Sequence, residues 1–135
     1  MNYENIGRAV KTAGGVLAAV CHVAFGGADI WLKALLAVIC MDYITGVMGA
    51  FASGRLDSRV GFKGIFKKVM ILCVVALAAR LDLLLGATGA LRGLAIGFYL
   101  ANDALSVLEN AAELGVPVPK KLVDKLEQMK EKEEE

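Results

Sequence analysis

The chain has 135 residues, of which 57% are hydrophobic and 21% are charged, with a mean hydropathy of +0.59 and a formal net charge of +1 at pH 7. Soluble domains average about 45–50% apolar residues, so this composition argues against a small water-soluble globule. It predicts a single domain that needs lipid around it, and the net charge points to no class of partner.

The first apolar segment leaves two topologies open. Residues 3–11 are polar, and Ile6 and Val10 stand four apart, which is typical of the start of a helix. Residues 12–28 carry no formal charge, but about 17 residues is the short limit for a membrane span. We therefore expect this segment either to span the membrane or to lie in its interface. His22 is most simply packed or interfacial, with a proton-relay role as the alternative.

Two further apolar segments form the centre of the sequence. Residues 30–53 are the strongest candidate span, and residues 66–86 follow after a short basic stretch. An apolar, basic and again apolar order over so few residues predicts a membrane hairpin with a cytoplasmic turn, whose natural neighbours are anionic headgroups. The basic residues of this predicted loop are Arg55, Arg59, Lys63, Lys67 and Lys68.

The last apolar segment is followed by a charged tail. Residues 91–110 are apolar up to Ala101 and then amphipathic, and the sequence GVPVP at 115–119 ends the segment because proline cannot continue a helix. Residues 120–135 repeat apolar side chains at helical spacing among Lys and Glu, which predicts a solvated amphipathic helix. A frayed end is the alternative for the last five residues.

Together these segments predict an all-α integral membrane bundle. We expect about four transmembrane helices, or three if the first lies in the interface, in a domain over 1–119, with a charged cytoplasmic tail over 120–135. With four spans, twelve of the fifteen basic residues fall on one side of the membrane. The positive-inside rule then places both termini in the cytoplasm.

Polar residues within the apolar segments are the candidate functional residues. A charge at the centre of a span costs about 2.5–3.5 kcal/mol on insertion scales, so such a residue should face protein or water, or be protonated. Asp42 lies near the middle of its segment, and Arg80 is the expected counter-charge for Asp42 or Asp103. Two small or polar stripes follow from helical spacing: Asp42, Thr45, Gly46 and Gly49 in one segment, and Asp103, Ser106 and Glu109 in another.

Two interpretations of these stripes stay open. In the first, Asp42, Arg80 and Asp103 pair within one subunit and hold a small bundle together. In the second, the stripes face neighbouring subunits or water in an oligomeric lesion. Gly93, Gly97 and Ala101 also stand four apart, a spacing that allows close helix packing but that is common by chance.

No arrangement of residues predicts catalysis, a cofactor or a metal site. The sequence has a single His, and none of its residues form a Ser/His/Asp set or a glycine loop suited to phosphate. The basic turn is too short and too close to lipid to predict nucleic-acid binding. Cys21, Cys40 and Cys73 all lie within apolar segments, where we expect packed free thiols.

Several stretches resemble the phage-lysis and toxin-secretion holins of Gram-positive bacteria and their phages. They are MDYITG at 41–46, SRVGFKGIFKK at 58–68 and FYLANDALSVLEN at 98–110, followed by GVPVP and the charged tail. They occur in the order and spacing of that family, and the resemblance covers about residues 30–130. Asp103 departs from the pattern, since the family more often has Glu there, but the acid is kept.

The resemblance implies a function that composition alone does not give. Holins accumulate in the cytoplasmic membrane, associate with themselves and open lesions at a set time. The lesions depolarise the membrane and release an endolysin, the functional partner, or in some relatives a large toxin. A homo-oligomer in membrane lipid is therefore expected, without a cofactor, and an antiholin is a possible partner. The alternative functions are an antiholin, or a small channel or scaffold that forms no large lesion.

Overall fold

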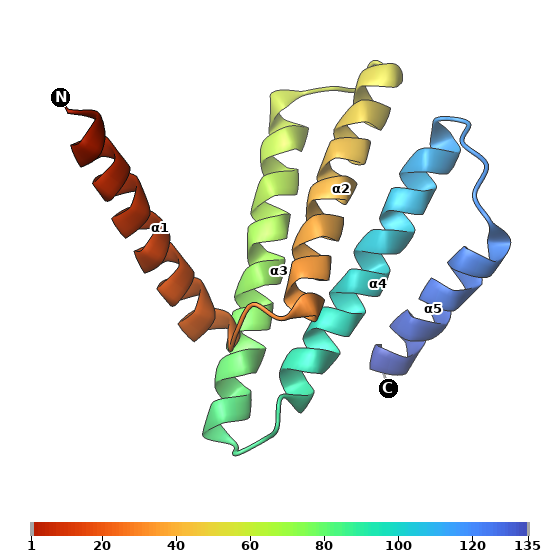
Figure 1. Cartoon of the computed structure of the whole chain (residues 1–135). Coiled ribbons are helices and arrows are strands. Elements are labelled where there is room, and N and C mark those ends of the chain that lie inside the picture. Colours follow the sequence, from red (N-terminus) through yellow and green to blue (C-terminus); the bar gives the residue numbers. More distant parts are fainter. Residues whose placement is uncertain (1, 135) are drawn as a thin grey trace.

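The computed structural model describes residues 2–134, and all of its regular structure is helical. Five helices follow one another along the chain (Figure 1). The predicted all-α fold is therefore confirmed. The helices are α1 (Tyr3–Phe25), α2 (Ile30–Ala52), α3 (Ser58–Leu84), α4 (Ala90–Glu113) and α5 (Lys120–Glu134).

Short polar caps and glycines set the ends of the helices. The Asp29 carboxylate accepts a hydrogen bond from the Leu32 N–H at 3.0 Å and caps α2, while Asp57 accepts from the Arg59 N–H at 3.2 Å and caps α3. Gly26 ends α1 with a φ of 73°, a left-handed conformation that only glycine adopts at little cost.

The early start of α3 corrects the predicted basic loop. We expected the second apolar arm to begin near residue 66, yet Asp57 caps a helix that begins at Ser58. The interhelical turn is therefore confined to residues 53–57, and only Arg55 of the predicted loop lies in it. The other four basic residues, Arg59, Lys63, Lys67 and Lys68, belong to the first turns of α3.

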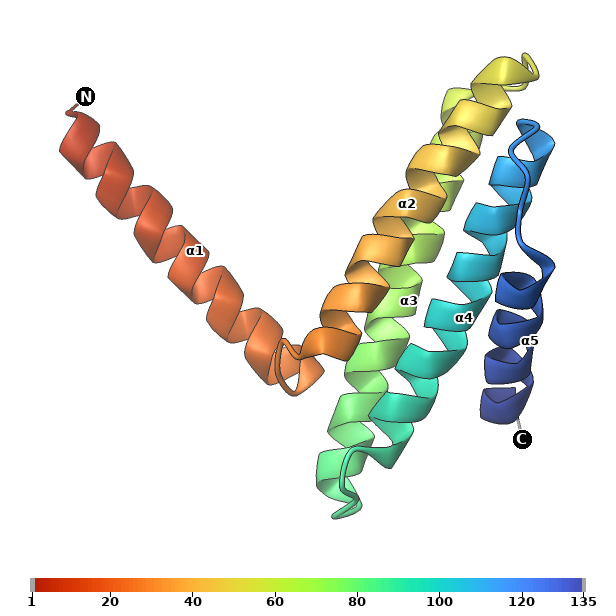
Figure 2. The same cartoon turned by 45° about the vertical axis from the view of Figure 1, so that its right-hand side comes forward.

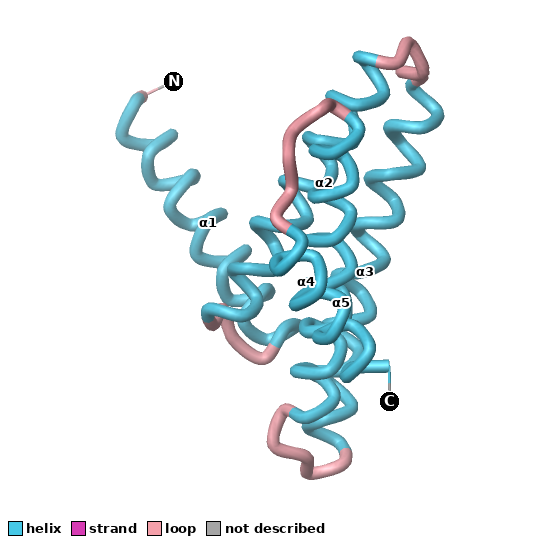
Figure 3. The backbone as a smooth tube through the Cα atoms, turned by 90° about the vertical axis from the view of Figure 1, so that its right-hand side faces the viewer, coloured by secondary structure: helices cyan, strands magenta, loops and turns pink. Residues whose placement is uncertain are grey.

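Three helices form the body of the molecule. Helices α2, α3 and α4 lie side by side, and α4 contacts α2, α3 and α5 (Figures 1 and 2). Helix α1 leans away and meets the bundle only near its C-terminal end, where it contacts α3. Seen from the right-hand side of Figure 1, α5 lies in front of α4 and folds back along it after the loop at 114–119 (Figure 3).

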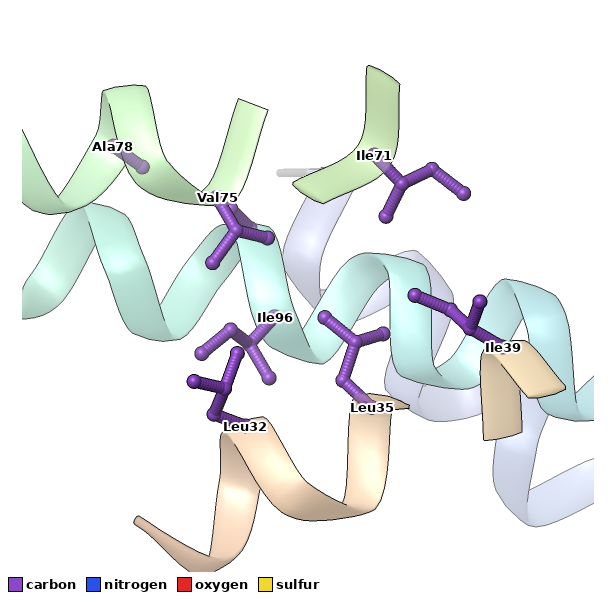
Figure 4. Close-up of a cluster of buried hydrophobic side chains, with 8 residues drawn as sticks. Leu32, Leu35, Ile39, Ile71, Val75, Ala78 and Ile96 are labelled. Carbon is purple, nitrogen blue, oxygen red and sulfur yellow. The ribbon is translucent and has the colours of Figure 1, made fainter. Parts of the chain in front are cut away.

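A layer of aliphatic side chains joins the three central helices. Leu35 and Val75 are fully buried, and Ile96 is 1% exposed (Figure 4). Within lipid, such a layer stabilises the bundle by close van der Waals packing rather than by exclusion of water. The complete cluster is Leu32, Leu35, Ile39, Ile71, Val75, Ala78, Ala95 and Ile96.

The outer surface of the bundle is also apolar. Phe51 is 75% exposed and Leu84 is 81% exposed, and α1 has no buried residue along its length. So large an exposed apolar surface marks contact with a membrane or another protein. By length and composition, α1 and α2 are the two described helices that could each cross a membrane.

The cysteines lie differently from the expected packed thiols. All three are free, but Cys40 and Cys73 are exposed on the outside of the bundle and Cys21 is half-buried. The prediction of packing is therefore wrong for Cys40 and Cys73 within one chain. Their apolar character matches the exposed Leu and Val side chains around them, since a free thiol behaves as a small hydrophobe.

Candidate functional site

A cluster of three charged side chains joins α2, α3 and α4. The Lys68 ammonium on α3 donates to the Asp103 carboxylate of α4 at 2.7 Å and to the Asp42 carboxylate of α2. The side chains of Asp103, Asp42 and Lys68 are 3%, 11% and 14% exposed. We call these three residues the buried charge cluster.

Neutral polar groups extend the cluster toward the end of the bundle that carries the 53–57 turn. The Asn110 amide donates to the Thr45 hydroxyl at 2.9 Å and to the Asp42 carboxylate at 3.4 Å. Gly46 lies beside this amide, and a Cβ there would be in ordinary van der Waals contact with Asn110 Nδ2, at 3.8 Å. Ser106 lines the adjoining cavity of about 240 Å³ between the three helices.

The charges of the cluster do not balance. One ammonium faces two carboxylates, so the cluster carries a net charge of −1 when all three groups are ionised. Buried charges are tolerated only when they are paired and hydrogen-bonded. Within residues 2–134 no buried side-chain nitrogen or oxygen lacks a hydrogen-bond partner. The arrangement therefore ties three helices together through one lysine.

The predicted counter-charge was the wrong residue. Arg80 lies outside the cluster and donates instead to the Val23 carbonyl oxygen near the end of α1. Lys68 takes the expected place, although we assigned it to the basic turn. The signal was its spacing: Lys68, Ile71, Val75, Ala78 and Asp82 stand three or four residues apart on one side of α3, and the last four are buried.

The remaining predicted residues divide between several surfaces. Asp42, Thr45, Gly46, Asp103 and Ser106 come together around the cluster and its cavity. Glu109 does not share the stripe of Asp103 and Ser106, because it is exposed beside α5. Gly49 lies toward the end of α2, in a shallow recess with Ser53, Arg55 and Glu113.

The basic residues at the start of α3 form an exposed stripe. Arg59, Lys63 and Lys67 stand four residues apart, and none of them forms an ion pair within the described part of the chain. Phe62 and Phe66 are exposed between them, at 62% and 67%. Cations alternating with aromatic rings suit the boundary between headgroups and acyl chains.

Sequence reasoning missed a second arginine site at the turn between α1 and α2. Arg92 makes two hydrogen bonds to the Asp29 carboxylate, at 2.8 and 3.1 Å, and also donates to the carbonyl oxygens of Phe25 and Gly27. Arg80 and Arg92 thus bind two of the last carbonyl groups of α1, those of Val23 and Phe25, and the Phe25 side chain packs against the aliphatic core. Cations are well suited to the C-terminal end of a helix dipole.

We expect Arg92→Gln to loosen this turn. Hydrogen bonds from Arg92 and then from the Leu32 N–H hold the pKa of Asp29 below its ordinary value of 3.8. A lowered pKa stabilises the fold above pH 3.8, and this contribution is lost as the pH falls through the folded value. Thermal unfolding in detergent should show that acid destabilises the variant less than the wild type. The difference in the free energy of unfolding should be about 1 kcal/mol or less, because the Asp29 side chain is half exposed. Lys33→Gln is the matched control and should keep the wild-type acid dependence.

A buried acid on α3 caps the next helix. Asp82 is 4% exposed and accepts from the N–H groups of Leu91 and Arg92 at 3.0 and 2.9 Å, where α4 has only Gly89 as its own cap. We expect Asp82→Ala to lower the free energy of unfolding by about 1–2 kcal/mol, because two N–H groups lose their acceptor. Denaturation in mixed micelles measures this, and Asp82→Asn, which keeps one acceptor oxygen, should lose less.

Comparison with known proteins identifies the family. The family model described as the bacteriophage holin family matches residues 19–131. An uncharacterized protein of Listeria innocua is 44% identical over 77% of this chain and 74% of its own length. An uncharacterized protein of Clostridium perfringens is 46% identical over 80% and 83%, and a probable holin of Bacillus phage phi105 is 34% identical over 71% of each chain. No solved structure matches the chain. The predicted resemblance is thus confirmed, and the chain belongs to the bacteriophage holin family.

Proposed function

We propose that this protein is a lesion-forming holin of the bacterial cytoplasmic membrane. Copies of the chain accumulate in the membrane, associate, and at a set time open lesions that depolarise it. The lesions release an endolysin, or a toxin in a toxin locus. Family membership and the apolar outer surface support a membrane holin, and the buried charge cluster supports the step in which the bundle rearranges.

The main support for this proposal is the position of the buried charge cluster along its three helices. Asp42, Lys68 and Asp103 each lie within about three residues of the middle of their helices. At 1.5 Å per residue α2, α3 and α4 are about 35–40 Å long, against a hydrocarbon thickness of about 30 Å. A bundle that spans the membrane therefore holds one ammonium and two carboxylates near the bilayer midplane. Charges at that depth must pair with one another or meet water.

Such a cluster has two alternative environments. In a single chain, Lys68 satisfies both carboxylates and the helices stay together. In an assembly, the same groups can face water or a neighbouring copy, at which point their mutual pairing is no longer required. A net charge of −1 favours the second arrangement, because water solvates the surplus carboxylate better than lipid does.

We further propose four spans with both termini in the cytoplasm. The turns at 53–57 and 114–119 lie at one end of the bundle, and the 85–89 turn lies at the other (Figure 1). The basic stripe of Arg59, Lys63 and Lys67 belongs to the first of these ends, so the positive-inside rule assigns that end to the cytoplasm. If α1 instead lies in the interface, the bundle has three spans and the same end stays cytoplasmic.

Induced expression in a bacterium tests the proposal. Membrane potential and the release of a co-expressed cytoplasmic endolysin are followed together. We expect the potential to collapse abruptly after a delay, with lysis that depends on the endolysin. Prompt, graded and ion-selective currents without release of endolysin would indicate a small channel. A stable potential with abundant protein in the membrane, and delayed lysis by a second holin on co-expression, would indicate an antiholin.

A further inference from the structure

The charged helix α5 packs along the outer side of α4, from the C-terminal end of α4 to Gly97. Val123, Leu126 and Met129 form its half-buried stripe, and the loop at 114–119 turns α5 antiparallel to α4 (Figure 3). At the far end, the Glu133 carboxyl group sits over Gly97, where a Cβ would lie 3.1 Å from Glu133 Cδ. The two helices thus pair over most of the length of α4.

This pairing brings many charges to the depth of the acyl chains. Gly97 is sixteen residues from the C-terminal end of α4 at Glu113, which is about 24 Å along the helix. A hydrocarbon core is only about 30 Å thick, so α5 runs across most of it if α4 spans the membrane. The exposed charged residues of α5 are Lys120, Lys121, Asp124, Lys125, Glu127, Glu131, Lys132 and Glu134.

The exposed side of α5 cannot lie against lipid. Each unpaired charge inside the hydrocarbon region is costly, and the exposed side of α5 carries eight charged residues along its length. The opposite side of the same α4–α5 pair faces α2 and α3 through the buried Ala95, Ile96 and Ala101, and its one buried charge, Asp103, is paired with Lys68. The pair therefore has one side suited to a membrane bundle and one side suited to water.

We propose that α5 packs on α4 only where that side of α4 meets water, so that the α4–α5 pair forms the water-facing wall of the lesion. This inference rests on the proposed holin function. While α4 is surrounded by lipid, α5 stays in the cytoplasm, and it folds onto α4 as the lesion opens. Four basic and four acidic residues on the exposed side give this wall a balanced charge, so ions of either sign should pass it with little selectivity.

Disulfide cross-linking measures the pairing directly. The three native cysteines are replaced with alanine, and Gly97→Cys is combined with Glu133→Cys. Oxidation with copper phenanthroline is applied at intervals after induction, while membrane potential is recorded in the same culture. We expect the linked fraction to rise at least about tenfold as the potential falls, because the exposed charges of α5 then meet water.

Matched variants make this result specific. Lys132→Cys in place of Glu133→Cys puts the thiol on the exposed side of α5, so it should link far less to position 97. Gly93→Cys with Met129→Cys is a second pair, since Gly93, Met129, Gly97 and Glu133 line one recess between α4 and α5, and a Cβ at Gly93 meets nothing within 4 Å. This second pair is used for the same measurement if the first pair of cysteines disturbs folding.

The membrane potential, recorded in the same cultures, distinguishes a failure of the proposed role of α5 from a failure of the proposed holin function. A linked fraction that is already maximal before the potential falls, or that stays near zero afterwards in both pairs, would overturn the role of α5 and leave the holin function standing. A potential that never falls would overturn the holin function, and the role of α5 in a lesion with it.

Discussion

Replacing Lys68 with methionine is expected to produce the largest loss of stability in the bundle. Asp42 and Asp103 then share the interior without a cation, and breaking a buried pair by removing one partner costs about 3–5 kcal/mol. Methionine is unbranched like lysine and only one heavy atom shorter, so the loss of stability comes mainly from the missing charge rather than from a cavity. Unfolding of the purified protein in mixed micelles measures the change.

Two further variants locate the cause of that loss. Lys67→Met removes a neighbouring exposed lysine that forms no ion pair in the described part of the chain, and its effect should stay within about 0.5 kcal/mol. Adding Asp42→Asn and Asp103→Asn to Lys68→Met removes the uncompensated charges and should recover much of the stability. A Lys68→Met protein as stable as wild type would show that the lysine does not hold the three helices.

The ends of the apolar helices were the most predictable part of the fold. Helices α2 and α4 begin and end within about three residues of the predicted 30–53 and 91–110, because glycines and polar residues interrupt the apolar sequence sharply there. The start of α3 was harder to predict. Its first turns are rich in Lys and Arg and resemble a loop by composition, while the cap at Asp57 is a single residue.

The acids of the site were predicted, and the cation was not. In α3, Lys68 lies about 20° around the helix from the buried Val75, whereas Arg80 lies about 140° from it at 100° per residue. Helical register therefore favours Lys68, but counting charges for the positive-inside rule placed it in the turn. The packing of α5 on α4 could not be predicted from helical register, because the apolar stripe of α5 is equally typical of a solvated amphipathic helix.

Replacing Asp42 with leucine should delay lysis while leaving insertion intact. The cluster holds two carboxylates and one ammonium, so removing Asp42 leaves a neutral pair of Lys68 and Asp103 at 2.7 Å. The Asn110 amide keeps the Thr45 hydroxyl as its acceptor at 2.9 Å. The resting bundle thereby loses its surplus charge, which costs about 2.5–3.5 kcal/mol near the bilayer centre on insertion scales.

Because this change stabilises the closed bundle, the lesion should open later, or not within the normal lysis period. The amount of membrane-inserted protein and the time of depolarisation are measured in the same cultures. Asp42→Asn removes the charge but keeps a polar group of the same shape, so it should also delay depolarisation, to a smaller extent. If Asp42→Leu only inserts more efficiently and depolarises the membrane on the wild-type schedule, the surplus carboxylate has no part in triggering, and the cluster serves only to join the helices.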